Sequence, residues 1–209
     1  MKSALLLAAL AAALPARASA PQGGARTFAV AYGAAAFAVA TDANATAERV
    51  TVRRLGLDGG VLWEQRYGTG ANELPVGAAV TSWGGVSVAG DDDSGCFVAH
   101  WASNGAQKWQ NSLRYGSECH VRAVLVDANG DTYVLGTTTQ GGVLGPSVWK
   151  IDNRGTVDWN YSPAGPQARY AFALTLDAAG DGVTATTAMN SGGSWTYDSF
   201  DLDANGRAR

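Results

Sequence analysis

The chain has 209 residues, of which 46% are hydrophobic and 16% charged, a composition typical of one large globular domain or two small ones. Its 15 basic and 18 acidic residues give a net charge of −3 at pH 7, and the basic residues are scattered along the chain. We therefore expect neither nucleic acid nor an anionic membrane as a partner, since both require clustered Lys and Arg.

The first 18 residues have the features of a secretory signal peptide. A basic start at Lys2 precedes an apolar run from Ala4 to Leu14, and Ala16-Arg17-Ala18 is a cleavage signal of the small-x-small type. The run is too short to span a bilayer, and no later segment of the sequence is suited to span one. Cleavage after Ala18 leaves a leader at residues 19–26 and predicts a secreted or periplasmic protein with a net charge of −5, from 13 basic and 18 acidic residues.

A repeat fills the rest of the chain, residues 27–209. Three phrases that begin with Gly end in Trp63, Trp109 and Trp159, at spacings of 46 and 50 residues. Glycines of a second marker, Gly84, Gly130 and Gly180, recur at the same two spacings. Periods of this length are typical of propeller or solenoid units.

Each repeat unit contains four short segments with strand character, separated by turn residues. In the third unit we expect strands at Val121–Asp127, Thr132–Thr137, Ser147–Asp152 and Val157–Tyr161. In the fourth unit we expect them at Ala171–Asp177, Val183–Thr187 and Ser199–Leu202. The segment Asp127-Ala128-Asn129-Gly130-Asp131 fits a turn, because Asp and Asn bond to nearby backbone and Gly accepts a positive φ. It also resembles a calcium loop at first sight, but its recurrence at successive turns favours backbone capping.

The predicted fold class is all-β: a β-propeller-like array of about four four-stranded antiparallel blades. We expect Trp63, Trp109 and Trp159 to pack between blades. A sandwich or solenoid of the same strands is the alternative. The expected blades are residues 27–68, 76–115, 121–162 and 170–209.

The fourth unit is incomplete in this pattern. Its Trp is expected one residue beyond Arg209, so the last blade has no outer strand. Our hypothesis is either a fragment of a longer propeller or an open arc of blades, with self-association through the exposed last blade as a further expectation.

The third unit also resembles a known family. The motif D-x-x-G-D-x-Y-V-x-G-T begins at Asp127, and V-x-K-x-D-x-x-G-x-x-x-W runs from Val148 to Trp159. Both are similar to the repeats of secreted bacterial β-propeller proteins called SBBP repeats, and Tyr67-Gly68 and Tyr115-Gly116 resemble the linkers of that family. The G-x-x-x-W element is more distantly similar to the repeats of quinoprotein (PQQ-like) propellers. The resemblance implies a propeller fold outside the cytoplasm and no particular activity.

The two cysteines are predicted to form a disulfide. Cys96 ends the loop between the second and third strands of unit two, and Cys119 ends the linker into unit three. Propeller connectivity places both loops on one face, and an even number of cysteines in an exported protein favours pairing. Two separate buried thiols are the alternative.

The same loop face collects the side chains that we take as a candidate binding face. It consists of Tyr67, Glu73, Asp91, Asp92, Asp93, Tyr115, Glu118 and His120. Carboxylates beside an imidazole are suited to a cation, but Asp91-Asp92-Asp93 lacks the ligand spacing of a calcium loop, so no metal site is predicted. The other histidine, His100, occupies a polar slot on the solvent-facing side of a half-buried strand and is interpreted as structural.

No catalytic motif occurs in the sequence: there is no Gly-x-Ser-x-Gly, Walker loop or His-Glu-x-x-His. We therefore expect no cofactor and a non-enzymatic binding or scaffold module, whose loop face takes a protein, peptide or glycan. The alternative is the N-terminal part of an extracytoplasmic propeller enzyme, quinoprotein-like or a hydrolase, with catalytic groups outside this chain.

Overall fold

The computed structural model describes residues 26–42, 49–68, 72–113, 116, 118–163, 165–178, 180 and 182–209. The signal peptide, most of the leader and Tyr115 lie outside these residues. The described part of the chain forms β-strands throughout, and it contains no helix long and apolar enough to cross a membrane.

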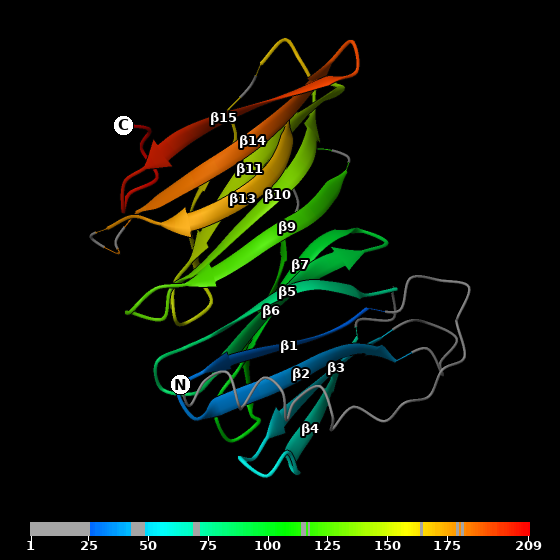
Figure 1. Ribbon diagram of the computed structural model, residues 1–209, viewed down its shortest axis with the longest axis vertical. Helices are drawn as coiled ribbons and strands as arrows, with labels where there is room; N and C mark the ends of the chain where they lie inside the picture. The colour runs from blue at the N-terminus through cyan, green and yellow to red at the C-terminus, as the bar shows by residue number, and fades with distance from the viewer. Residues whose placement is uncertain are drawn as a thin grey trace.

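Fifteen strands form four antiparallel sheets in chain order, each with sequential neighbours paired (Figure 1). Sheet 1 contains β1 (Thr27–Tyr32), β2 (Ala35–Asp42), β3 (Arg49–Leu55) and β4 (Val61–Tyr67). Sheet 2 contains β5 (Leu74–Val80), β6 (Val86–Asp92), β7 (Gly95–Trp101) and β8 (Gln107–Leu113). Sheet 3 contains β9 (Cys119–Val126), β10 (Thr132–Gln140), β11 (Val143–Ile151) and β12 (Val157–Tyr161). Sheet 4 contains β13 (Tyr170–Leu176), β14 (Val183–Ser191) and β15 (Ser194–Leu202).

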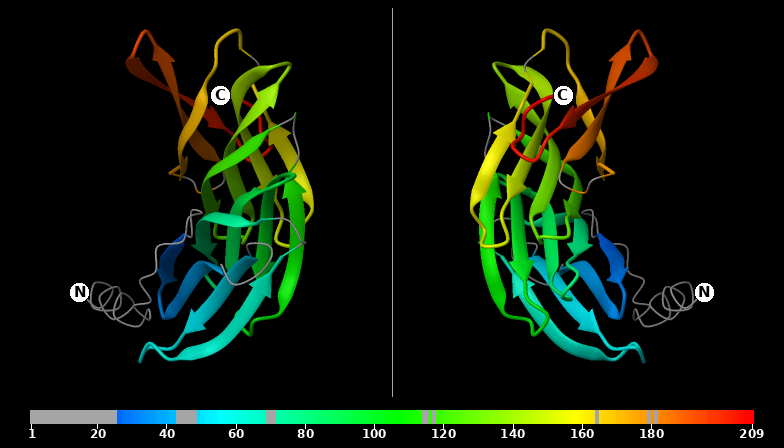
Figure 2. Two further views of the ribbon diagram at one scale, coloured as in Figure 1. Left: turned by 90° about the vertical axis from the view of Figure 1, so that its right-hand side faces the viewer. Right: turned by 90° about the vertical axis from the view of Figure 1, so that its left-hand side faces the viewer.

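The sheets stack face to face in a curved row, with sheets 1 and 4 at its ends (Figures 1 and 2). A separate apolar core fills each of the three interfaces, because alternate residues of every strand point to opposite faces. Sheets 2 and 3 are thus buried on both faces, which explains the apolar runs in β6, β7 and β10. The first strands β1, β5, β9 and β13 follow one another along the row, and β5 and β13 each pack against β9.

The hairpins of sheets 3 and 4 are longer than the sequence indicates. We expected the second and third strands of unit three to end at Thr137 and to begin at Ser147, but β10 and β11 pair as far as Gln140 and Val143. In sheet 4, β15 begins at Ser194 rather than Ser199. The run Thr137-Thr138-Thr139 has no apolar side chain and so gives no strand pattern, although pairing in a hairpin requires none.

Aspartates close the repeated turns by binding the backbone. The Asp127 carboxylate accepts hydrogen bonds from the N–H groups of Asn129 (2.8 Å) and Asp131 (2.9 Å). Asp152 and Asp203 accept from the residues two and four positions later in the same way. Burial is the largest single influence on the pKa of Asp152 and raises it, but the backbone bonds together outweigh it and hold that pKa below its usual value. The backbone bonds, that of Arg207 first, likewise lower the pKa of Asp203. The Asp-Gly turns therefore serve as backbone caps.

Each repeat Trp packs on a turn glycine of the following sheet. In all three cases a Cβ on the glycine would lie about 3 Å or less from the indole ring. The pairs are Trp63 on Gly105, Trp109 on Gly155 and Trp159 on Gly206. Only a glycine permits this approach, and each of the three also has a positive φ.

His100 is buried rather than solvent-facing, so this expectation is wrong. Its side chain is only 6% exposed, its ring stacks on Trp109 with centroids 5.4 Å apart, and its Nδ1 lies 3.0 Å from Ser87 Oγ. This side of β7 would face solvent in a sheet covered on one face only, but sheet 3 covers the second face of sheet 2.

Candidate functional site

A disulfide joins sheets 2 and 3 at one end of their interface. Cys96 at the start of β7 and Cys119 at the start of β9 are bonded, with Cα atoms 5.5 Å apart. Both side chains are buried, at 0% and 5% exposure. The bond anchors the beginning of β9, which supplies His120 and Arg122 to the adjoining surface, with Glu118 directly before the strand.

A groove of about 420 Å³ opens beside this disulfide. It brings together three residues of the candidate binding face, namely Asp91, Glu118 and His120, with Arg26 and Arg122. Two carboxylates, two guanidinium groups and an imidazole therefore line one depression. Such a mixture favours a ligand that carries both kinds of charge over a simple ion.

The acidic side of the groove is held by short contacts. Asp91 accepts a hydrogen bond from the backbone N–H of Val121 at 2.7 Å, and its other oxygen lies 3.3 Å from Nδ1 of His120. Glu118 accepts from the hydroxyl of Thr139 at 3.1 Å. The His120 side chain is 65% exposed, so one face of the imidazole stays open to a ligand.

Asp92 and Asp93 point to other partners. Asp92 accepts from the N–H and hydroxyl of Ser94, and Asp93 binds the backbone and side-chain amide of Asn72. The three consecutive carboxylates thus diverge. Within the described residues no three His, Cys, Asp or Glu side chains converge as metal ligands would.

Tyr67 and Glu73 lie in the interior, so their placement on a ligand-accessible face is corrected. Tyr67 is 5% exposed and packs on Phe97 and Trp101, and Glu73 is fully buried. Burial, followed by the charges of Glu73 and Asp92, raises the pKa of Tyr67 to about 12. Tyr67 ends β4 and belongs to the apolar core between sheets 1 and 2.

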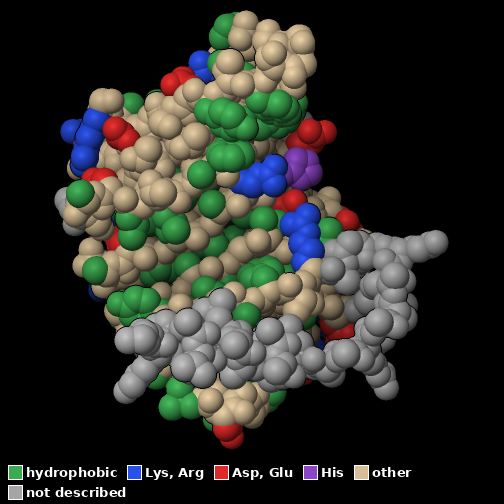
Figure 3. Space-filling view, in the orientation of Figure 1, with side chains coloured by type: hydrophobic (Ala, Val, Ile, Leu, Met, Phe, Trp, Pro, Cys, Tyr) green, Lys and Arg blue, Asp and Glu red, His purple; other side chains and the backbone are tan. Residues whose placement is uncertain are grey.

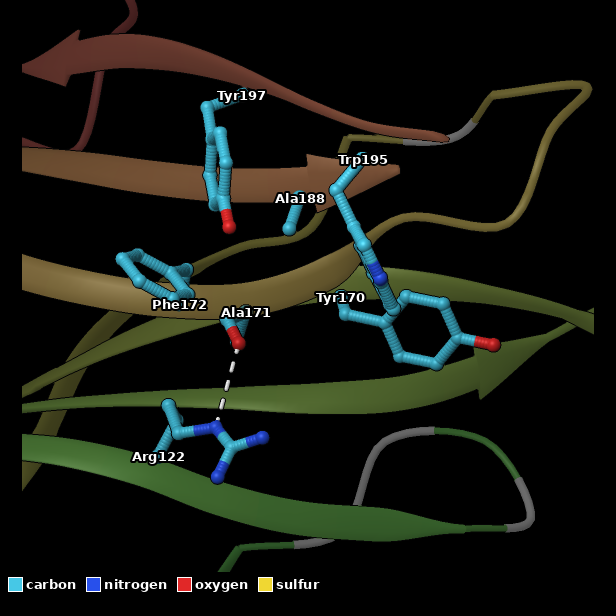
Figure 4. A pocket seen from close by; sticks show the side chains of 7 residues that line it. All are labelled: Arg122, Tyr170, Ala171, Phe172, Ala188, Trp195 and Tyr197. Carbon is cyan, nitrogen blue, oxygen red and sulfur yellow. Dashed lines mark hydrogen bonds between the residues drawn. The ribbon is translucent and has the colours of Figure 1, made fainter. Parts of the chain in front are cut away.

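A smaller pocket of about 240 Å³ continues from the groove, with which it shares Arg122 and Tyr170 (Figure 4). Two aromatic pairs form its walls: Tyr170 against Trp195, with centroids 5.9 Å apart, and Phe172 against Tyr197 at 5.0 Å. Ala188 lies between the pairs, and Arg122 donates from Nε to the carbonyl oxygen of Ala171 at 3.4 Å. We call this the aromatic pocket.

The aromatic pocket lies on the face of sheet 4 that points away from sheet 3. Its rings are between 37% and 59% exposed, and they form a hydrophobic patch beside a basic side chain and a histidine (Figure 3). Tyr170 and Phe172 alternate along β13, and Trp195 and Tyr197 alternate along β15.

The rest of this face is polar, unlike the corresponding faces of the other sheets. The central cross-strand pair facing the next sheet is Val39–Val52 in sheet 1, Ala89–Val98 in sheet 2 and Leu135–Val148 in sheet 3, all fully buried. In sheet 4 the pair is Thr186–Ser199, whose hydroxyls lie 3.2 Å apart, and Thr184 donates to Asp201 at 2.6 Å. These side chains satisfy one another across the strands.

Sequence reasoning did not identify the aromatic pocket. The alternation Trp195-x-Tyr197 is a usable signal, since residues two apart on a strand share a face. It was missed because the strand was taken to begin at Ser199. Arg122 was missed because the bulge between Leu135 and Gly136 in the β9–β10 pairing changes which β9 side chains face the groove.

No protein-family model matches the sequence, and no curated protein is similar to it at a significant level. Among solved structures, a mutant of puromycin hydrolase complexed with PGG is 20% identical, with a TM-score of 0.49. A second puromycin hydrolase structure is 21% identical with a TM-score of 0.47, and a eukaryotic initiation factor is 8% identical with a TM-score of 0.46. The matches cover 83% of this chain for the hydrolase structures and 89% for the initiation factor. The chain spans 26% of the length of each hydrolase chain and 54% of the initiation factor.

Proposed function

We propose that the protein is an exported, non-catalytic binding module that holds an extended peptide segment in the groove and the aromatic pocket. The observation that carries this proposal is the continuity of the two depressions through Arg122 and Tyr170. An apolar pocket next to a groove of mixed charge matches the chemistry of a peptide, with one bulky side chain and flanking charged residues.

The aromatic pocket suits an apolar side chain. Its two edge-to-face ring pairs present apolar surface on both walls and a small Ala188 floor between them. Arg122 disfavours a cation there by like-charge repulsion. In the groove, Asp91 and Glu118 attract a basic residue, and Arg26 and Arg122 attract an acidic residue or a backbone carbonyl.

The burial of the Ser–His pair found among the described residues supports a binding role over hydrolysis. Ser87 and His100 are 3.0 Å apart, but Ser87 is fully buried and its hydroxyl also contacts Thr132 at 2.8 Å. A substrate carbonyl has no access to this hydroxyl. The disulfide supports export to an oxidising compartment, secreted or periplasmic.

We further infer that the four sheets are the blades of an open propeller arc. The Thr186–Ser199 and Thr184–Asp201 bonds support a free outer face on sheet 4, because a further apolar sheet there would take these polar groups out of water. The alternative, a larger propeller enzyme of which this chain is the N-terminal part, requires such a sheet.

An array of fluorescein-labelled octapeptides tests the proposal. Each peptide carries one Leu, Phe or Trp flanked by Lys and Glu in both orders, and fluorescence anisotropy reports binding to the purified mature chain. We expect a subset to bind, and Phe172→Ala with Trp195→Ala to weaken that binding at least tenfold.

Tyr32→Ala supplies the matched control, since Tyr32 is 60% exposed on β1 at the other end of the row. This variant should bind as the wild type does. The absence of binding by every peptide, or binding that survives the pocket substitutions, would overturn the proposal. Binding of a neutral oligosaccharide such as chitohexaose in place of the peptides would also contradict it.

A further inference from the structure

A second depression lies between sheets 2 and 3, at the opposite end of β6 from the groove. Trp83 precedes β6 and lines this depression, whereas Asp91 of the groove lies near the end of β6. Its volume is about 430 Å³, and we call it the turn pocket because turn residues form most of its wall. Its lining includes Trp83, His100, Lys108, Trp109, Asn153 and Arg154.

The turn pocket is positively charged in an acidic protein. Lys108 and Arg154 both line it, and no Asp or Glu does. No ion pair joins either cation to a carboxylate of the described residues. Two unneutralised cations at one opening attract an anion.

A hydrogen bond that the repeat makes at two interfaces is missing at this one. The indole N–H groups of Trp63 and Trp159 donate to carbonyl oxygens in the next sheet's turn, each at 2.9 Å. The equivalent group of Trp109 is buried and has no acceptor among the described residues. A buried N–H without a partner costs about 1–3 kcal/mol, so it marks a position where an acceptor is favoured.

The turn that would supply this acceptor is bound elsewhere. The backbone N–H of Asn153 donates to a carboxylate oxygen of Asp131 at 3.2 Å, and its side-chain amide donates to the carbonyl oxygen of Asn129 at 3.1 Å. Both bonds direct the turn toward its own sheet.

Aromatic surfaces complete the turn pocket. Trp83 is 50% exposed, although its ring edge packs so closely on Gly130 that a Cβ there would lie 2.0 Å from the indole. The indole is therefore fixed in position while still offering surface to a ligand. His100 stacks on Trp109 behind it.

We propose that the turn pocket binds a small organic carboxylate that carries a planar ring, with the ring against Trp83 and the carboxylate between Lys108 and Arg154. This site is independent of the groove and of the peptide-binding proposal, since the two lie at opposite ends of β6. The carboxylate also adds acceptor atoms to the pocket in which Trp109 lies.

Benzoate is the probe, and benzamide is its neutral counterpart of nearly the same shape. The seven Trp side chains each give one indole ¹⁵N–¹H resonance, and Trp83→Phe and Trp109→Phe assign the two of interest. We expect benzoate to shift both resonances in a saturable way and to bind at least tenfold more tightly than benzamide.

Lys108→Gln with Arg154→Gln removes the two cations from exposed positions, and each single variant provides a second measurement. We expect the double variant to weaken benzoate binding at least tenfold. Arg66→Gln with Arg169→Gln changes the net charge equally at distant sites and should leave binding unchanged. Equal binding of benzoate and benzamide, equal loss in the control, or no shift of the Trp83 and Trp109 resonances would each overturn the proposal.

Discussion

At the scale of single residues, glycines determine how closely one sheet approaches the next. Gly155 combines two constraints, a φ of +94° and an approach in which a Cβ would lie 2.5 Å from the Cβ of Trp109. Gly142 has a similar φ of +82° with nothing within 4 Å of the added Cβ. A comparison of substitutions at Gly155 and Gly142 therefore separates the cost of backbone strain from the cost of overpacking the interface.

Gly155→Ala is expected to lower the free energy of unfolding by about 2–4 kcal/mol, because strain and overpacking add. Gly142→Ala should lower it by only about 1 kcal/mol, from the unfavourable φ alone. Urea unfolding followed by Trp fluorescence measures both. Equal losses in the two variants would refute the packing role of Gly155.

His100 makes stability depend on pH. Burial, and secondarily the charge of Lys108, lowers its pKa from 6.5 to about 4, so the folded state binds fewer protons than the unfolded state between these values. The contribution is fully present above pH 6.5 and is lost as the pH falls toward 4. This contribution to the free energy of unfolding is on the order of 3 kcal/mol.

We therefore expect His100→Gln to show a weaker loss of stability between pH 7 and pH 4 than the wild type does. Urea midpoints at half-unit pH intervals give the comparison. The idea fails if the slopes of wild type and His100→Gln coincide.

At the scale of elements, the disulfide ties β7 to β9 across an interface that otherwise depends on packing. It closes a loop with a sequence separation of 23, which restricts the unfolded chain by about 3 kcal/mol. Because β9 also begins the groove, the bond connects the stability of the interface to the shape of the binding surface.

Cys96→Ala with Cys119→Ala is expected to reduce the free energy of unfolding by about 2–4 kcal/mol. Reduced wild type should match the double variant, and each single variant should show no further loss. A double variant as stable as the oxidised wild type would show that the bond adds nothing.

The strands and turns within one sheet could be predicted from the sequence, but the contacts between sheets could not. Local turn chemistry at Asp127 and the period of Trp63, Trp109 and Trp159 indicate sheets of the observed order, because these signals lie within one unit. His100, Tyr67 and Glu73 were misplaced because their burial depends on the neighbouring sheet. The aromatic pocket was missed for the same reason: it arises only when β9, β13 and β15 are brought together.

At the scale of the whole molecule, the row of sheets has two different ends. The outer face of sheet 4 consists of two parts that differ in polarity. One part of that face is aromatic, and the other carries Thr184, Thr186, Ser199 and Asp201. Self-association through the last sheet remains a prediction, and the polar pair offers a direct way to examine it.

Thr186→Leu with Ser199→Val installs the pair that sheet 3 has at the corresponding position, Leu135–Val148. We expect this variant to associate more strongly than the wild type, because its outer face then resembles a buried interface. Sedimentation equilibrium at several concentrations measures the difference. Unchanged mass averages for both proteins would contradict the role assigned to the polar pair.

The disulfide lies in the central interface of the three, between the two sheets that are packed on both faces. In a row of units, opening begins where a unit has one neighbour and proceeds inward. Backbone amides of β6, β7, β9 and β10 should therefore exchange with deuterium more slowly than those of β2, β3 and β14, and limited proteolysis should leave a disulfide-linked central fragment. The order in which the sheets unfold is thus set by the number of neighbours of each sheet, and the cross-link holds the last two together.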